Sequence, residues 1–178
     1  MIQRVIQFWR AINAHLSGSD FDFINIYLNK KEQNLFFAMR LYDQRHVLNV
    51  AYTARRLAQK DGGSINEKLL MKACLLHDVG RTAEDIFLFD KVFAVLLDKY
   101  LPKTAHKLAK YNNSRNRSFW KKRRHALFIY YHHAAIGAEK LQKIKLYDIA
   151  EIIKYHHAPP KYGDCRELII LRKADSLN

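Results

Sequence analysis

The apolar residues of the chain recur at helical spacing over most of its length. Over residues 2–16 they follow the i, i+3, i+4, i+7 pattern of an amphipathic helix, which residues 17–20 break. A short apolar segment spans residues 21–28. The helical period then runs on over residues 32–60 and predicts one long helix after a cap at Asn29. No run of useful length shows the two-residue period of a strand, so the pattern predicts an all-α chain.

The second half of the chain adds further helical segments separated by turn residues. They lie at about residues 64–80, 90–100, 119–141, 146–157 and 164–176, and the third is either continuous or broken once. Gly80 is expected to stop the first of them, and the second stops before Pro102. Because the connections are short and 178 residues is an ordinary length for one core, we expect residues 1–178 to form a single compact helical bundle.

Composition narrows the class of protein. Hydrophobic residues make up 49% of the chain, too many for a disordered protein, and 6 Gly and 3 Pro are too few for a β-sandwich. Two cysteines, Cys74 and Cys165, exclude a disulfide scaffold and a four-cysteine zinc site. The chain has no run of 18 uncharged apolar residues and no apolar signal core near residue 1, so we expect no membrane span and a cytoplasmic location.

The positive charge is concentrated in one stretch. The chain carries 31 Lys and Arg against 17 Asp and Glu, and no acidic residue lies between Asp98 and Glu139. Ten basic residues fall between Lys99 and Arg124, which predicts either a surface that attracts phosphates or nucleic acid, or an ordinary solvated surface. The N-terminal helix, with Phe8 and Trp9, packs either on its own core or on a second copy in a homodimer, and the sequence leaves both open.

Six side chains that can bind metal lie on apolar helix faces. His77, for example, follows Ala73 and Cys74 at i+4 and i+3, and His156 follows Ile152 and Ile153 in the same way. The full set is His46, His77, Asp78, His133, His156 and Asp175. Each alone has an ordinary explanation, such as an ion pair of Asp175 with Arg172 or a lysine. Because an unpaired buried carboxylate is costly, the six together favour cations among them.

This set resembles the HD superfamily of metal-dependent phosphohydrolases, which carries a lone His, a His-Asp doublet and a distant Asp. The matching positions are His46, His77, Asp78 and Asp175. Leu75–Arg81 resembles the family's apolar-apolar-HD-apolar-Gly-basic signature, and Leu171–Leu177 resembles its last helix. The resemblance covers about residues 44–177. It implies an HD-like core over residues 44–178 and an N-terminal helical extension over residues 1–43.

Two further segments resemble a dinuclear subset that includes bacterial diadenosine tetraphosphate hydrolases. They are His133–Ala138, with its His-x-x-x-Gly-Ala pattern, and Ile153–His157. The resemblance implies that His46, His77, Asp78 and Asp175 hold one cation, and that a bridging Asp78 holds a second with His133 and His156. His157 is an additional candidate ligand, because cyclic-dinucleotide phosphodiesterases use both members of a His-His pair. This chain lacks their Gly-Tyr-Pro motif.

The activity implied is hydrolysis of a nucleotide, or of a related small phosphoester or phosphoanhydride, by metal-activated water. Imidazoles and carboxylates without thiolate suit one or two ions of Fe, Mn, Zn, Ni or Co, and the resemblance favours Fe or Mn. Asp78 and Arg81 are the expected catalytic residues. Arg81 is expected near the site mouth as a bidentate phosphate ligand, or else in an ion pair with Asp78 or Glu84, and Arg45 is a second phosphate-binding candidate.

Three other functions stay open at this point. One is a nuclease or phosphodiesterase that acts on RNA or single-stranded DNA through the Lys99–Arg124 stretch. Another is a non-catalytic, nucleotide-binding regulatory module, although such a module has no need of every ligand. The last is a helical interaction protein whose histidines are structural.

Overall fold

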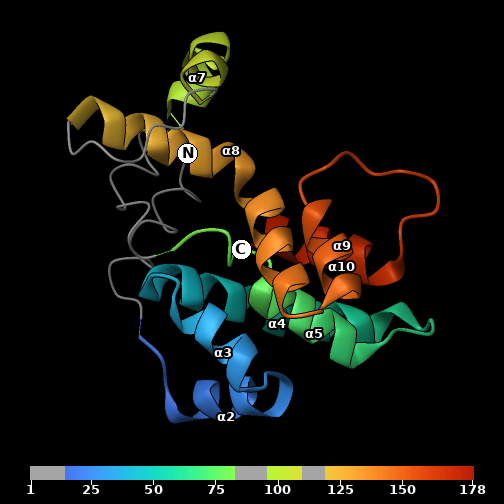
Figure 1. The fold of residues 1–178 in the computed structure, drawn as a ribbon. Helices are drawn as coiled ribbons and strands as arrows, with labels where there is room; N and C mark the ends of the chain where they lie inside the picture. The colour runs from blue at the N-terminus through green and yellow to red at the C-terminus, as the bar shows by residue number, and fades with distance from the viewer. Residues whose placement is uncertain (1–14, 83–95, 110–118) are drawn as a thin grey trace.

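The computed structural model describes residues 15–82, 96–109 and 119–178, and these residues form helices joined by turns, with no strand among them (Figure 1). The helices are α2 (Gly18–Tyr27), α3 (Lys30–Phe37), α4 (Leu41–Asp61), α5 (Glu67–Leu76), α7 (Pro102–Ala109), α8 (Phe119–Lys143), α9 (Tyr147–Lys154) and α10 (Arg166–Ser176). The all-α prediction is therefore confirmed. The expected helix over residues 2–16, except its last two positions, the loop at residues 112–114 and the start of the 90–100 segment lie outside the described residues.

Residues 17–20 were expected to break a helix. Residues 15–17 are not helical, and a new helix, α2, begins at Gly18, since Ser17 and Asp20 form a capping box. The Ser17 hydroxyl accepts from the backbone N–H of Asp20 at 3.3 Å, and the Asp20 carboxylate accepts from the backbone N–H of Ser17 at 2.7 Å. The short apolar segment at residues 21–28 is thus the continuation of a helix.

The prediction of one helix over residues 32–60 is wrong, because α3 ends at Phe37 and α4 begins at Leu41. The side-chain amide of Gln44 donates to the carbonyl of Met39 at 2.8 Å and stabilises the connection. Neither Gly nor Pro marks this break. The apolar period continues across it because Phe36 and Val47 pack in the same core. The sequence also missed α7, which begins with Pro102 at its first position.

The core surrounds α4 and α5. Helix α4 packs against α5 and α10, α9 packs against α8 and α5, and α2 and α3 contact α5 from the other side (Figure 1). Phe23 and Ile24 of α2 and Phe36 of α3 belong to the same buried cluster as Leu48 of α4 and Leu75 of α5. The described part of the expected N-terminal extension therefore shares the main core.

Helix α8 is continuous over its 25 residues, and its N-terminal half leaves the body of the protein together with α7 (Figure 1). We call residues 96–109 with residues 123–131 of α8 the projecting lobe. Its own small core contains Ala105, Ala109 and Leu127. Within the described ranges, we find no helix with the length and hydropathy of a membrane span.

Candidate metal centre

The His-Asp doublet lies in the turn that follows α5. Helix α5 ends at Leu76, and residues 77–80 form the turn, so Gly80 does not stop the helix as expected. Its role is close packing instead, because a Cβ at Gly80 would lie 1.9 Å from the carbonyl oxygen of His133 in α8. A Cβ at Gly137 would lie 3.2 Å from the backbone nitrogen of Gly80. The two glycines allow this turn and α8 to approach each other closely.

Three histidines are oriented by the same kind of hydrogen bond from the ring to the backbone. Each Nδ1 donates to the backbone carbonyl three residues earlier: His77 to Cys74 at 2.8 Å, His133 to Tyr130 at 2.9 Å and His156 to Ile153 at 2.6 Å. Because Nδ1 carries the proton, Nε2 of each ring presents a lone pair. Nε2 of His77 and Nε2 of His156 are buried without a hydrogen-bond partner. This arrangement is typical of imidazoles that bind a metal ion.

The first group of ligand atoms comes from three parts of the chain. His46 of α4, His77 and Asp175 of α10 place one ligand atom each within 4.8 Å of one another. Nε2 of His46 lies 3.0 Å from Oδ1 of Asp175, and Nε2 of His77 lies 3.7 Å from the same oxygen. Burial alone would raise the pKa of Asp175, but the hydrogen bond with His46 and the neighbouring His77 ring hold it below its ordinary value. Asp175 is therefore a carboxylate at neutral pH.

Asp78 connects this group to further histidines. Its Oδ2 lies 3.8 Å from Nε2 of His77, and its buried Oδ1, which has no hydrogen-bond partner, lies 3.4 Å from Nε2 of His133. Two overlapping groups result: His77, Asp78 and His156, and His133, His156 and His157. All six predicted ligands therefore lie together.

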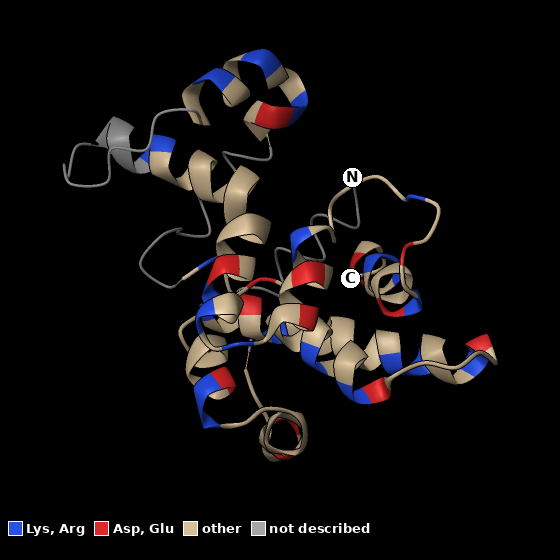
Figure 2. Ribbon diagram, turned by 45° about the vertical axis from the view of Figure 1, so that its right-hand side comes forward, with Lys and Arg blue, Asp and Glu red and all other residues tan. Residues whose placement is uncertain are grey.

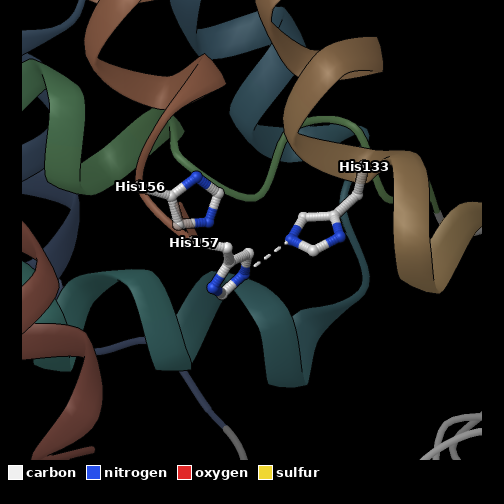
Figure 3. A group of neighbouring side chains, drawn as sticks. All are labelled: His133, His156 and His157. Carbon is white, nitrogen blue, oxygen red and sulfur yellow. Dashed lines mark hydrogen bonds between the residues drawn. The ribbon is translucent and has the colours of Figure 1, made fainter. Parts of the chain in front are cut away.

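The third group joins α8 to the turn after α9, and its imidazoles gather in one place (Figure 3). Nε2 of His133 lies 3.0 Å from Nε2 of His157, and the rings of His156 and His157 lie 3.9 Å apart between centroids. The expected helix over residues 146–157 ends at Lys154, so both histidines lie in the turn that follows. The turn brings both rings of the pair into the group, including the additional candidate His157.

The charge states of these groups suit cation binding. Burial lowers the pKa of His156 to about 3, and burial together with the Arg81 charge lowers the pKa of His133 well below its ordinary value. Burial also lowers the pKa of His157. Burial alone would raise the pKa of Asp78, but Arg81, His77 and His133 hold it well below its ordinary value. At neutral pH the site therefore offers the neutral imidazoles of His133, His156 and His157 together with ionised carboxylates.

The donor set fits a divalent transition metal. Ligand atoms about 2.1 Å from one ion, at tetrahedral or octahedral angles, lie about 3.0–3.4 Å apart. The 3.0 Å distances from His46 to Asp175 and from His133 to His157, and the 3.4 Å distance from Asp78 to His133, match this range. The unpartnered buried atoms Nε2 of His77, Oδ1 of Asp78 and Nε2 of His156 would gain a partner.

The family comparison agrees with this geometry. The HD domain family model matches residues 44–178, three quarters of the chain. The chain belongs to the HD domain family. No curated protein and no solved structure matches the chain. HD domains bind divalent metals and are usually metal-dependent hydrolases, and the His and Asp groups of this HD domain can hold such ions.

The two arginines expected to bind phosphate both form ion pairs with carboxylates. Arg81 is buried rather than at a mouth, with Nη1 2.6 Å from Oδ2 of Asp78 and Nη2 3.0 Å from Nε2 of His133. The alternative, an ion pair with Asp78, is the contact observed, and Glu84 lies outside the described residues. Arg45 makes a bidentate pair with Asp20 of α2, with both contacts at 2.8 Å.

Two neighbours of the candidate metal ligands in this HD domain were not predicted. The carboxylate of Asp43, one turn before His46, is buried, with Oδ1 4.0 Å from Nη1 of Arg81. The sequence could have indicated Asp43 by its position one turn before His46, which puts both residues on the same face of a helix. Arg172 pairs with Asp164 at 2.5 Å rather than with Asp175, and it donates to the carbonyl of Tyr155 at 2.9 Å. Since Tyr155 directly precedes His156, Arg172 fixes the turn that carries this histidine.

Proposed function

We propose that this HD domain hydrolyses a nucleotide, or a related small phosphoester or phosphoanhydride, with metal-activated water. One observation carries the proposal. Three imidazoles, each with Nδ1 hydrogen-bonded to a backbone carbonyl, direct Nε2 into a cluster that also holds two ionised carboxylates. A helical protein that only binds other proteins would not need several buried nitrogen and oxygen atoms without hydrogen-bond partners in one cluster.

The residues divide into two cation positions in this proposal. His46, His77 and Asp175 would hold one cation, His133, His156 and His157 would hold the other, and Asp78 would be shared by both. When bound, divalent cations neutralise phosphate oxygens and lower the pKa of a water molecule toward neutrality. The backbone carbonyls of Cys74, Tyr130 and Ile153 keep the imidazoles in the ligating tautomer. We propose Fe or Mn as the resident metal.

The proposed substrate class rests on a resemblance in the two segments that carry His133, His156 and His157. The likeness of His133–Ala138 and Ile153–His157 to the diadenosine tetraphosphate hydrolase subset supports dinucleoside polyphosphates as the first compounds to assay. Arg81, which reaches both Asp78 and His133, is the nearest guanidinium observed beside these ligands. We propose that it contributes to binding substrate phosphate once it is released from these partners.

A second candidate, hydrolysis of RNA or single-stranded DNA, is favoured by the projecting lobe. Lys99, Lys103 and Lys107 are exposed there, and Figure 2 shows basic residues on α7 and on the segment before it. Arg124 precedes His133 by nine residues, about 14 Å along a helix, so a bound strand of a few nucleotides would span both. This candidate predicts higher activity on oligonucleotides than on mononucleotides, with a strong salt dependence.

The test is a hydrolysis assay with Mn²⁺-loaded and Fe²⁺-loaded protein. The panel contains nucleoside phosphates, dinucleoside polyphosphates, cyclic nucleotides and a single-stranded oligonucleotide. Phosphate or nucleotide release is expected from the wild type and not from Asp78→Asn. Arg166→Gln, which removes a surface pair with Asp61, serves as the matched control and is expected to keep the activity. Nucleotide binding by calorimetry without any release would contradict the proposal and indicate a regulatory module.

A further inference from the structure

The guanidinium of Arg81 already uses two of the atoms that the cluster offers to a cation. Its Nη1 donates to Oδ2 of Asp78 at 2.6 Å, and its Nη2 donates to Nε2 of His133 at 3.0 Å. Since Nδ1 of His133 donates to the carbonyl of Tyr130, Nε2 has a single lone pair, which Arg81 occupies. These contacts are buried, where charge-assisted hydrogen bonds are strong.

The atoms of the first group are not involved in this contact. Arg81 contacts neither His46 nor Asp175 at hydrogen-bond distance among the contacts observed, and those two residues pair with each other at 3.0 Å. Oδ1 of Asp78 is also without a hydrogen-bond partner. Arg81 therefore occupies a ligand atom that belongs to the His133 position alone, Nε2 of His133. At the other position it contacts only the shared Asp78, through Oδ2, which lies 3.8 Å from Nε2 of His77. Its charge opposes a cation most strongly on the side of the cluster that includes His133.

Arg81 also has a second carboxylate within reach. Oδ1 of Asp43 lies 4.0 Å from Nη1 of Arg81, and both residues are buried. A movement of about 1 Å would bring the two atoms to the usual 2.9 Å of a hydrogen bond. Asp43 lies on α4, one turn before His46, and is not itself one of the residues assigned to the cations.

We propose that Arg81 competes with a divalent cation for Asp78 and His133, and that Asp43 is the partner to which Arg81 moves when the cation binds there. This inference rests on the two-cation site of the proposed function. It makes Arg81 a residue that sets the affinity of the second cation position. The consequence is ordered loading, with the position of His46, His77 and Asp175 filled first. The position of His133, His156 and His157 is filled at higher metal concentration.

The experiment is a calorimetric titration of chelator-treated, full-length protein with Mn²⁺ alone. Arg81→Gln removes the competing charge and is expected to lower the second dissociation constant about tenfold, the equivalent of one charge-assisted hydrogen bond. Asp43→Asn removes the second partner of Arg81 and is expected to raise the same constant. In both variants the first constant is expected to change less than the second, because Arg81 contacts the first position only through the shared Asp78. The control Arg166→Gln keeps both constants.

The outcomes separate this inference from the proposed function. Two Mn²⁺ per chain in the wild type, with a second constant that is unchanged or raised in Arg81→Gln, would overturn the competition and leave the proposed function standing. No Mn²⁺ binding by any of the proteins would overturn both. If Arg81→Gln does not fold, the test rests on Asp43→Asn. A higher second dissociation constant for Mn²⁺ in this variant supports the competition, and an unchanged one overturns it.

Discussion

The sharpest structural prediction concerns Gly80, where the turn of the His-Asp doublet touches α8. In Gly80→Ala, the new methyl group would lie 1.9 Å from the carbonyl oxygen of His133 and 2.7 Å from its carbonyl carbon. These are backbone atoms of a continuous helix, so no side-chain rotation relieves the overlap. To restore an ordinary contact of 3.4 Å, the turn and α8 must separate by about 1.5 Å.

The separation would act on both stability and metal binding. Overpacking of this kind costs about 2–3 kcal/mol, which lowers the melting temperature of a chain of this size by roughly 4–10 °C. It would also lengthen the 3.4 Å distance from Oδ1 of Asp78 to Nε2 of His133 to as much as about 4.9 Å. Two ligands on one ion cannot lie more than about 4.2 Å apart, twice the metal–ligand distance. We therefore expect Gly80→Ala to lose the cation that Asp78 shares with His133.

Thermal unfolding and Mn²⁺ titration measure the two effects. Gly18→Ala is the matched control, because nothing lies within 4 Å of its added methyl group. Gly18 is the first residue of α2, so this variant is expected to be neutral or more stable by up to about 1 kcal/mol. Equal melting temperatures and equal Mn²⁺ binding for Gly80→Ala and Gly18→Ala would refute the argument that the glycine is needed for this contact.

Three further predictions concern the surroundings of the site. Arg172→Gln removes the contact with the Tyr155 carbonyl. It should weaken Mn²⁺ binding by His156 and lower the free energy of unfolding by about 1–3 kcal/mol. An unchanged Mn²⁺ affinity in calorimetry would contradict this prediction. Burial alone would raise the pKa of Asp20, but hydrogen bonds from Arg45 and Ser17 outweigh burial and lower it. The stability that ionised Asp20 contributes to the fold is therefore present above the ordinary pKa of 3.8 and is lost as the pH falls through the pKa of the folded state. The deficit of Asp20→Asn in urea unfolding should shrink by about 1 kcal/mol from pH 7 to pH 3, and a deficit independent of pH would argue against the pair. Mn²⁺ at about 100 times its dissociation constant should raise the melting temperature of chelator-treated wild type by roughly 5–10 °C, whereas no shift would argue against a metal site in the folded core.

Much of the site could be predicted because its residues follow local patterns. His77 and His156 follow apolar residues at i+3 and i+4, Asp175 follows Leu171 at i+4, and His46 precedes Val50 by one turn. A side chain on the apolar face of a helix points toward the core. Their meeting in one cluster came from the likeness to a known family, since spacing along a helix does not say which helices become neighbours. The packing of α4 against α5 and α10 supplies that information.

What could not be predicted depends on tertiary contacts. The break between α3 and α4 is stabilised by a hydrogen bond from the Gln44 side chain. The spacing of the apolar residues continues unchanged across it, so this spacing does not reveal the break. Arg81 was expected either near the site mouth or in an ion pair with Asp78 or Glu84. Its long side chain turns back to Asp78 and also reaches His133, a contact that the sequence did not predict. A flexible side chain of this length reaches partners that no local pattern identifies.

The central claim is that Asp78 holds metal ions together with the surrounding histidines. Elemental analysis of purified wild type and Asp78→Ala, each reconstituted with iron or manganese and freed of excess metal, tests it most directly. We predict one to two equivalents of metal in the wild type and none retained in Asp78→Ala, with the same helical circular dichroism in both. Equal metal content in the two proteins, or no metal in either after reconstitution, would contradict the account.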